Sequence, residues 1–378
     1  MAEEKKVNLN ALTSDFYQMV YLNMKNIYLQ ILDQQSADSP LILATVTRTN
    51  GSTPQKPGSS ALFCKKGLIS GTVGGGIVEG KVQKISLDAV LSRKSGHFHF
   101  NLANDISNTE EAICGGQISV LVDANINNSI PVFEQVKQSL AKQIPGVLIT
   151  MVTGFTEKMV LINRYWMSEI FKPSIPVGFL EKIEPVVMCL LSAANPSDYR
   201  ELELTIPDEE PSSLFFLEPI FPPAQLVIAG AGHIGKALSH LGSMLDFEVT
   251  VIDDRPEYAS VENMSDAGHI IVKDIGEAMQ ELKKSDNTYV VIVTRGHKDD
   301  AAALKPCIGS DLAYTGMIGS KKKIATMRMN FIENGWATGK QWNQIHAPVG
   351  LDIQSQTVEE IAVSIAAQLV LVRNSKRK

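Results

Sequence analysis

Short apolar segments alternate with longer amphipathic ones along the second half of the chain. The short runs, of the kind that form buried parallel strands, are QLVIAG, EVTVIDD, GHIIV and TYVVIVT. The segments between them with apolar residues at helical spacing are HIGKALSHLGSMLD and IGEAMQELKK. This order predicts βαβα units and a Rossmann-like, doubly wound, mostly parallel sheet. A last helix is predicted from Thr357, which forms a capping-box pattern with Glu360 and precedes the apolar stripe Val358, Ile361, Ile365 and Leu369.

The first half of the chain shows a mixed pattern. An amphipathic helix is predicted over residues 15–33, then a strand at LILATVTRT and a hairpin at ALFCKKGLIS. A glycine-rich run follows, and beyond it Val78, Val82, Ile85 and Ala89 recur at helical spacing. Alternating segments that we assign to one sheet are QISVLVDA, GVLITMVTG and KMVLINRYWM. We therefore expect a mixed α/β domain in this half.

Prolines and acidic residues interrupt the pattern between the two halves. Residues 195–223 contain six of the chain's 17 prolines, and such a density predicts a linker. We therefore expect an N-terminal domain over 1–194, a linker over 195–223 and a Rossmann-like domain over 224–378. Two domains suit a chain of 378 residues, because the usual length of a domain is about 150 residues.

Charge and apolar content limit the classes of function. With 35 basic and 41 acidic residues the net charge is −6, so no overall field favours nucleic acid or an anionic membrane. No apolar run reaches the length of about 18 residues that a membrane span needs, and MAEEKK lacks the apolar segment of a signal peptide. We therefore expect a cytoplasmic protein with no nucleic-acid or membrane partner.

The segment GAGHIGKA, at Gly230–Ala237, fits two phosphate-binding patterns. The phosphate-loop pattern needs a hydroxyl after the lysine to hold magnesium, and Ala237 has none. The dinucleotide pattern needs a preceding strand, a following helix and an acid at the end of the second strand, which Asp253 supplies. The sequence favours the dinucleotide fold, in which the loop binds a dinucleotide, holds another phosphorylated ligand or serves packing alone.

Each residue of this pattern has an expected role. Gly230 allows the tight turn, Gly232 lets the backbone approach a pyrophosphate, and Gly235 allows close packing of the helix. Asp253 favours NAD through a ribose hydroxyl, while Arg255 keeps NADP open. The cofactor expected at this loop is therefore NAD(P).

Two histidines accompany this predicted sheet edge. His233 lies in the glycine loop, where it caps the helix or faces the ligand. His297 follows the fourth strand, where open α/β sheets place ligand contacts. It is an acid–base residue, a ligand contact or a residue with structural hydrogen bonds only. The lysine run at 319–323 either attracts phosphate or begins a solvated helix.

The glycine-rich run GTVGGGIVEG, at Gly71–Gly80, lies between a predicted strand and a predicted helix. Such a junction presents unpaired backbone N–H groups, so Gly74, Gly75 and Gly76 are candidates for an anion site. Glu79 falls in the first helical turn, where it either caps the helix or contacts a ligand.

The four cysteines form no CxxC pair, which argues against a zinc ribbon, an iron–sulfur cluster and a disulfide framework. Cys114 precedes Gly115 and Gly116 at a predicted turn, where a thiolate could ligate a soft metal or carry a sulfur atom. A buried, unreactive thiol is the alternative. His97 and His99 share one face of a predicted strand, but no third ligand is near in sequence, so we expect no metal site there.

Several of these motifs occur together, in one order, along both halves of the chain. They are NGSTPQKPG, GTVGGGIVEG, AICGGQISVLVD, LEPIFPPAQLVIAGAGHIGKAL, VTVIDDRPEYAS, TRGHKDD, GMIGSKKK and APVGLDIQSQTVEEIAVSI. In this set and order the sequence resembles the xanthine dehydrogenase accessory family, XdhC/CoxI. Many members have Cys or His after the glycine triplet, where this chain has Ile77, and an arginine after Ser-Thr-Pro, where it has Gln55 and Lys56.

The resemblance implies a chaperone for the molybdenum cofactor rather than a catalyst. Members hold the pyranopterin–molybdenum cofactor while a cysteine desulfurase provides its sulfur, and then deliver it to an apo molybdenum hydroxylase. A homodimer is also expected from the family. On this model Gly74–Gly76 seat the cofactor, Gly115 and Gly116 belong to the same site, and Glu79 and Cys114 face the metal end.

An NAD(P)-dependent oxidoreductase is the main alternative hypothesis, and a nucleotide-sensing scaffold without catalysis is a third. In the oxidoreductase Asp253 holds the ribose, and His233 or His297 handles a proton. The N-terminal glycine and cysteine motifs distinguish the accessory protein from the oxidoreductase, because a simple dehydrogenase does not need them. The sequence therefore favours the accessory protein.

Overall fold

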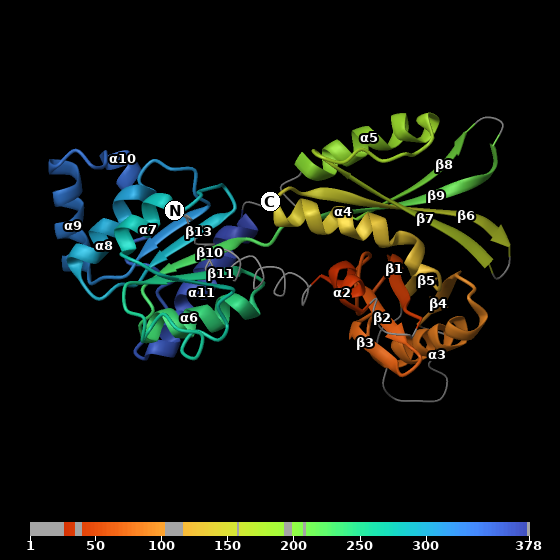
Figure 1. Cartoon of the computed structure of the whole chain (residues 1–378), viewed down its shortest axis with the longest axis horizontal. Coiled ribbons are helices and arrows are strands. Elements are labelled where there is room, and N and C mark those ends of the chain that lie inside the picture. Colours follow the sequence, from red (N-terminus) through yellow and green to blue (C-terminus); the bar gives the residue numbers. More distant parts are fainter. Residues whose placement is uncertain are drawn as a thin grey trace, which may run out of the picture. The chain divides into compact units, whose positions relative to one another are not determined.

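The structure, a computed structural model of the chain, describes residues 26–34, 40–102, 116–156, 159–192, 199–206 and 209–375 (Figure 1). The chain forms two compact units. The N-terminal unit lies within Leu22–Pro222, and the C-terminal unit contains Pro223–Lys378. Within the described ranges, no helix is both long and apolar enough to cross a bilayer.

The N-terminal unit contains two antiparallel sheets. The first has the strand order β3-β2-β1-β5-β4, with the bounds β1 Ile42–Asn50, β2 Ser60–Cys64, β3 Gly67–Gly71, β4 Gly96–Asn101 and β5 Gln117–Asp123. The predicted hairpin is confirmed as the β2–β3 pair. Helix α3 (Gly76–Ser92) covers one face, where Val82 shares a core with Ala44 and Val46 of β1. The glycine-rich run therefore joins a strand to a helix, as predicted.

The second sheet of this unit has the strand order β7-β6-β9-β8, with the bounds β6 Gly146–Thr156, β7 Met159–Ser168, β8 Arg200–Ile206 and β9 Glu209–Ile220. Helix α5 (Val177–Ser192) lies along one face of it (Figure 1). Helices α2 (Ile27–Asp33) and α4 (Ile130–Ala141), the latter preceded by a 3₁₀ turn at Ile126–Ser129, share a core with Trp166 of β7 and Leu43 of β1. This core joins the two sheets.

The N-terminal unit differs from the prediction in two respects. Segment 195–223, predicted as a linker, contains the paired strands β8 and β9. Phe215 and Leu217 of β9 are buried in the core, and this burial favours a strand despite the prolines. Pro219 lies only one residue from the end of the strand, where a proline is tolerated. The three strands assigned to one sheet are also divided, because β5 belongs to the first sheet and β6 and β7 to the second. Residues 15–25 of the predicted first helix lie outside the described residues.

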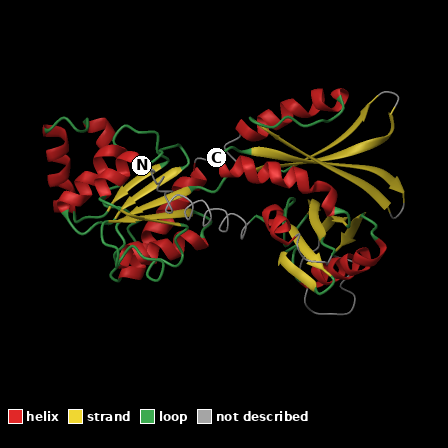
Figure 2. Cartoon of the chain, viewed as in Figure 1, coloured by secondary structure: helices red, strands yellow, loops and turns green. Residues whose placement is uncertain are grey.

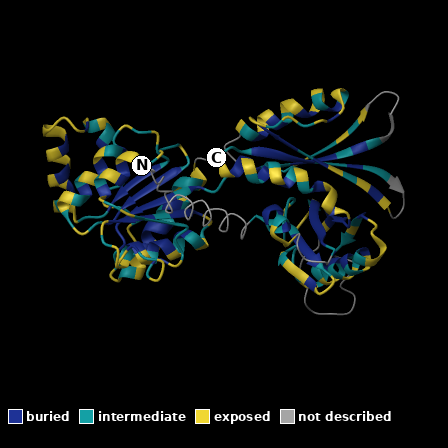
Figure 3. Ribbon diagram, in the orientation of Figure 1, coloured by how far each residue is buried: buried dark blue, intermediate teal, exposed yellow. Residues whose placement is uncertain are grey.

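The C-terminal unit is a five-stranded parallel sheet with helices on both faces, as predicted (Figure 2). Its strand order is β12-β11-β10-β13-β14, with the bounds β10 Gln225–Ala229, β11 Glu248–Asp253, β12 His269–Val272, β13 Thr288–Ile292 and β14 Tyr314–Met317. The helices are α6 (His233–Met244) and α11 (Val358–Ser375) on one face, and α7 (Ile275–Glu281), α8 (His297–Leu304), α9 (Lys321–Glu333) and the short α10 (Gly339–Trp342) on the other. The central strands are buried from both sides (Figure 3).

Local signals set the ends of the helices in this unit. The predicted capping box is confirmed: the Glu360 N–H donates to Thr357 Oγ1 at 3.2 Å, and the Thr357 N–H donates to Glu360 Oε2 at 3.1 Å. The lysine run begins α9, capped by Ser320 Oγ, which accepts from the Lys323 N–H. Because the strand order reverses between β10 and β13, the loops after these two strands meet at the switch point, where open α/β sheets bind ligands.

Candidate functional site

The glycine loop of the N-terminal unit leaves backbone uncovered at the start of α3. Gly75 is the N-cap of this helix, at φ 67°, and no side chain caps the helix. A Cβ atom added at Gly75 or Gly76 would have no atom within 4 Å, so both residues border open space. The start of α3 thus lacks a side-chain cap, and the predicted anion site at Gly74–Gly76 stays a prediction.

Glu79 supports this loop from within the first turn of α3. Its Oε2 accepts a hydrogen bond of 2.6 Å from the Thr72 hydroxyl, and the Thr72 Oγ1 accepts one of 3.1 Å from the Gly74 N–H. The carboxylate thus fixes the loop through Thr72. Of the two roles predicted for Glu79, capping of the helix is not observed, because α3 has no side-chain cap and the carboxylate instead accepts from Thr72.

The loop at 51–58, from the motif NGSTPQKPG, brings the predicted motifs of this unit together. A Cβ atom added at Gly74 would lie 2.8 Å from Pro54 Cγ, and one added at Gly116 would collide with the Ser52 carbonyl oxygen. Both glycines are therefore required by the close approach of this one loop. The first motif thus lies between the glycine triplet and the start of β5.

Two predicted residues of the site, Cys114 and Gly115, lie outside the described residues. Among the cysteines that the structure describes, Cys64 is half-buried, Cys189 is exposed and Cys307 is buried. Burial raises the pKa of the Cys307 thiol to about 12, which makes it a poor nucleophile. Within the described ranges no group of three or more His, Cys, Asp or Glu side chains is arranged to hold a metal ion.

The histidine pair of β4 belongs to a polar layer between the two sheets of this unit. His97 Nε2 lies 2.8 Å from the Thr47 hydroxyl, and His99 Nδ1 lies 2.7 Å from the Ser119 hydroxyl. Burial, and then the neighbouring His99, lower the pKa of His97 to about 4, so its ring is neutral at physiological pH. These histidines therefore make hydrogen bonds within the fold.

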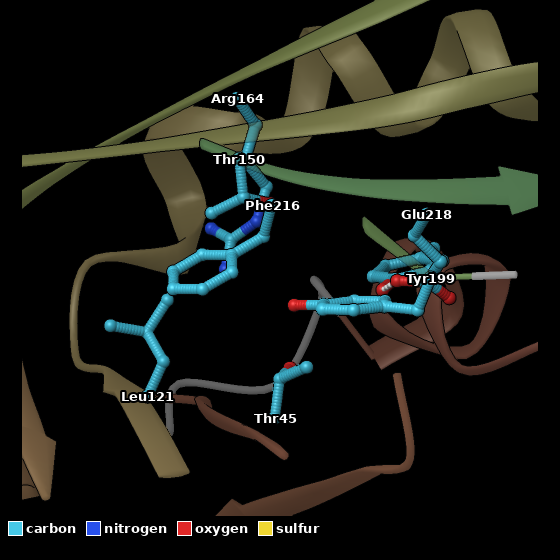
Figure 4. A pocket seen from close by; sticks show the side chains of 8 residues that line it. Thr45, Leu121, Thr150, Arg164, Tyr199, Phe216 and Glu218 are labelled. Atoms are coloured by element: carbon cyan, nitrogen blue, oxygen red, sulfur yellow. Dashed lines mark hydrogen bonds between the residues drawn. The ribbon is translucent and has the colours of Figure 1, made fainter. Parts of the chain in front are cut away.

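A cavity of about 10 Å³ lies in the same layer, large enough for about one water molecule (Figure 4). Its lining residues are Tyr28, Thr45, Leu121, Thr150, Arg164, Tyr199, Phe216 and Glu218. The buried Arg164 donates to Asp123 and, at 3.1 Å, to Ser129 Oγ. The Tyr28 hydroxyl donates to Glu218 Oε2 at 2.5 Å. Burial raises the pKa of Glu218 to about 7, and the Tyr28 hydrogen bond and the Arg164 charge offset this only in part.

Sequence reasoning missed this layer. Its signal was present, because polar residues share one face of the neighbouring strands: Thr45 and Thr47 in β1 and His97 and His99 in β4 are two positions apart, and Ser119 and Asp123 in β5 are four positions apart. The layer also adjoins the 51–58 loop. Tyr199, which lines the cavity, would lie 3.3 Å from a Cβ atom added at Gly58.

In the C-terminal unit, contacts account for the predicted roles of two of the three glycines. A Cβ atom at Gly230 would lie 2.5 Å from the Val293 carbonyl oxygen, and one at Gly235 would collide with the Gly230 carbonyl oxygen. These two glycines permit the turn and the close helix packing. A Cβ atom at Gly232 would have no atom within 4 Å, so that residue borders open space, and its predicted role at a pyrophosphate stays a prediction. His233, the first residue of α6, is exposed.

Asp253 lies next to this loop and is engaged by the protein itself. Its carboxylate accepts from the Ala231 N–H at 2.7 Å, and from the Arg255 side chain at 2.9 and 3.0 Å. The neighbouring Asp254 pairs with both oxygens to Arg295, at 2.9 and 3.0 Å. Both acids at the end of β11 thus have arginine partners.

The loop after β13 forms a second polar group at the same sheet edge. The fully buried Asp300 accepts from the Thr294 hydroxyl at 2.7 Å and forms an ion pair with Lys323 of α9. His297, the first residue of α8, is exposed on the same loop. The lysine run therefore contributes one residue, Lys323, that the fold fixes in place.

Comparisons with known proteins agree with this arrangement. The family described as XdhC and CoxI matches residues 34–101, and the XdhC Rossmann domain matches residues 226–369. A protein of Bacillus subtilis described as a probable xanthine dehydrogenase subunit is 27% identical over 347 residues, covering 90% of this chain and 94% of that protein. The uncharacterized protein YqeB from Escherichia coli is 23% identical over 351 residues, which are 93% of this chain but only 47% of YqeB.

A solved structure shares the fold. The crystal structure of a xanthine dehydrogenase from Bacillus halodurans superposes with a TM-score of 0.72 at 24% identity, covering 93% of this chain and 96% of that one. The two family matches fall on the two units, and each includes a glycine loop described above. The chain therefore belongs to the XdhC/CoxI family of xanthine dehydrogenase accessory proteins.

Proposed function

We propose that this protein binds the molybdenum cofactor and delivers it to an apo molybdenum hydroxylase of the xanthine dehydrogenase type. A cysteine desulfurase is the proposed source of the cofactor's sulfur. Family membership supports this class of function, and the similarity to a probable xanthine dehydrogenase subunit supports the class of client. The observation that carries the proposal is the convergence of the 51–58 loop, the glycine triplet and Gly116.

The described residues fit an anionic, phosphate-bearing cofactor. Gly75 and Gly76 border open space, and the N-terminus of α3 has no side-chain cap, so N–H groups remain available to an anion. Glu79 acts on this cradle through Thr72 and keeps the loop in shape. A side chain at either glycine would fill the space that the cofactor needs.

Cys114 is the proposed thiol of the site, two residues before Gly116 in the sequence. A thiolate suits a soft metal ion and accepts or passes a sulfur atom. The bound cofactor supplies the molybdenum centre that the client enzyme uses for catalysis. The part of this chain is to hold that group, exclude water from it and release it, which requires no reaction catalysed by the chain.

Two matched pairs of variants test the proposal in protein purified from cells that make the cofactor. Cys114→Ser is compared with Cys189→Ser, an exposed thiol of the same unit. Gly75→Asp, which puts a negative charge into the cradle, is compared with Gly80→Asp on an exposed turn of α3. The readouts are molybdenum, released pterin and the activity gained by an apo hydroxylase.

We expect Cys114→Ser and Gly75→Asp to lose most of the bound pterin or to fail to activate the apo hydroxylase. The control variants Cys189→Ser and Gly80→Asp should keep the pterin and activate the hydroxylase. Unchanged retention and delivery in Cys114→Ser would remove the thiol from the mechanism. Unchanged pterin in Gly75→Asp, with the variant folded, would remove the glycine cradle.

A further inference from the structure

The carboxylate of Asp253 has no hydrogen-bonding capacity left for a ligand. Oδ2 accepts from the Ala231 N–H at 2.7 Å and from Arg255 Nη2 at 3.0 Å. Oδ1 accepts from the Arg255 N–H at 3.1 Å and from Arg255 Nε at 2.9 Å. A carboxylate offers about four acceptor positions, and all four donors here belong to the protein. The residue is also 2% exposed.

Arg255 is itself held in this position. Its guanidinium lies 3.8 Å from the centre of the Tyr258 ring, and its side chain is only 18% exposed. Two parallel N–H···O bonds to one carboxylate give a fixed, planar geometry. Burial alone would raise the pKa of Asp253, but the hydrogen bonds from Arg255 and Ala231 hold it below its ordinary value. The pair therefore stays ionised and closed at neutral pH.

Asp253 occupies the position at which dinucleotide-binding Rossmann domains bind the ribose, so its pairing with Arg255 bears on ligand binding. In Rossmann domains that bind dinucleotides, an acid at the end of the second strand accepts hydrogen bonds from the ribose hydroxyls. Asp253 is the last residue of β11, which follows β10 and the glycine loop in the sequence and pairs with β10 in parallel. We propose that Arg255 is a specificity-determining residue that closes the ribose subsite, so that this unit excludes NAD(H) and other ligands held through a ribose diol.

Asp254, the next residue along the chain, does not replace Asp253 as an acceptor for the ribose. Both oxygens of Asp254 accept from one nitrogen, Nη2 of Arg295, which lies on the loop after β13. Because β10 lies between β11 and β13 in the sheet, this pair spans the end of the strand that leads into the glycine loop. The NAD-dependent oxidoreductase hypothesis therefore loses its ribose acceptor, Asp253, whether or not the proposed cofactor delivery is correct.

The test measures NADH binding by nicotinamide fluorescence and by calorimetry. The variants are Arg255→Gln, Arg255→Lys and, as a matched control, the exposed Arg328→Gln of α9. We expect no saturable binding of NADH to the wild type or to the control. Arg255→Gln frees two acceptor positions and should give saturable NADH binding, about tenfold or more tighter than the detection limit set by the wild type, the effect of one or two hydrogen bonds to a charged group. Adding Asp253→Asn should abolish the gain.

Arg255→Lys keeps the charge but not the two-pronged contact, so it should give a smaller gain, and it serves as the second variant if Arg255→Gln fails to fold. Micromolar binding of NADH to the wild type that depends on Asp253 would overturn the proposal. So would a folded Arg255→Gln variant with no gain. Tighter binding of NADPH to the wild type than to Arg255→Gln would also overturn it, because Arg255 would then serve as a contact for the 2′-phosphate.

Discussion

The buried carboxyl group of Glu218 makes the unfolding free energy of the N-terminal unit depend on pH. Its carboxyl group lines the cavity between the two sheets, and its hydrogen-bond donor in the structure is the Tyr28 hydroxyl. Burial raises the pKa of Glu218 from 4.5 to about 7. The perturbation we consider is Glu218→Gln, which keeps the shape of the side chain and its ability to accept from Tyr28 but removes the titration.

The sign follows from proton binding in the two states. Between pH 4.5 and about 7 the folded protein keeps a proton on Glu218 that the unfolded chain has released. The contribution of this group to stability is therefore full below pH 4.5 and falls as the pH rises to about 7. At about 1.4 kcal/mol per pKa unit, the loss across this window is about 3 kcal/mol. Above that window the loss is constant.

The assay is urea unfolding of the wild type and Glu218→Gln at several pH values from 4.5 to 8. Hydrogen exchange of peptides from β9 assigns the transition to the N-terminal unit. Relative to the wild type, the variant should gain about 3 kcal/mol of unfolding free energy between the lowest and highest pH. Glu181→Gln, on the exposed side of α5, is the matched control and should show no such gain. Parallel pH profiles of Glu218→Gln and the wild type would refute the reasoning.

Two further predictions concern the C-terminal unit. Gly235→Ala should destabilise it by about 2 kcal/mol, because the new methyl group meets the backbone oxygen of Gly230, whereas Gly232→Ala should cost less than about 1 kcal/mol. Equal melting temperatures of these two variants would contradict the packing argument. Asp300→Ala should cost about 3 kcal/mol in urea unfolding, because the Lys323 charge loses its buried partner. Asp299→Ala, on the same turn, should cost less than about 1 kcal/mol, and similar losses in the two would argue against a special role for the pair.

The parts of the fold that the sequence predicts well are those fixed by local patterns. The apolar runs of the second half predict a parallel sheet because strands covered on both faces need continuous apolar segments. Gly230 and Gly235 are predictable for a similar reason, since the strand–loop–helix spacing determines where backbone must approach backbone.

The parts that escaped prediction depend on contacts between distant residues. Prolines interrupt the sequence pattern around strands β8 and β9. Phe215 and Leu217 of β9 are buried because β9 pairs with β6 and because α5 packs on the sheet that they form. Glu218 and Tyr28 are 190 residues apart, so no local pattern joins them. Asp253 was assigned to the ribose from its position alone, whereas the geometry of Arg255 decides whether its oxygens are available.

The measurement that tests the central claim most directly is the amount of molybdenum and of released pterin per chain in wild-type protein, purified from cells that make the cofactor. The account predicts near-stoichiometric pterin together with the metal, and no bound NAD(H). Absence of both pterin and molybdenum, with NAD(H) bound in their place, would contradict cofactor delivery and the closure of the ribose subsite together.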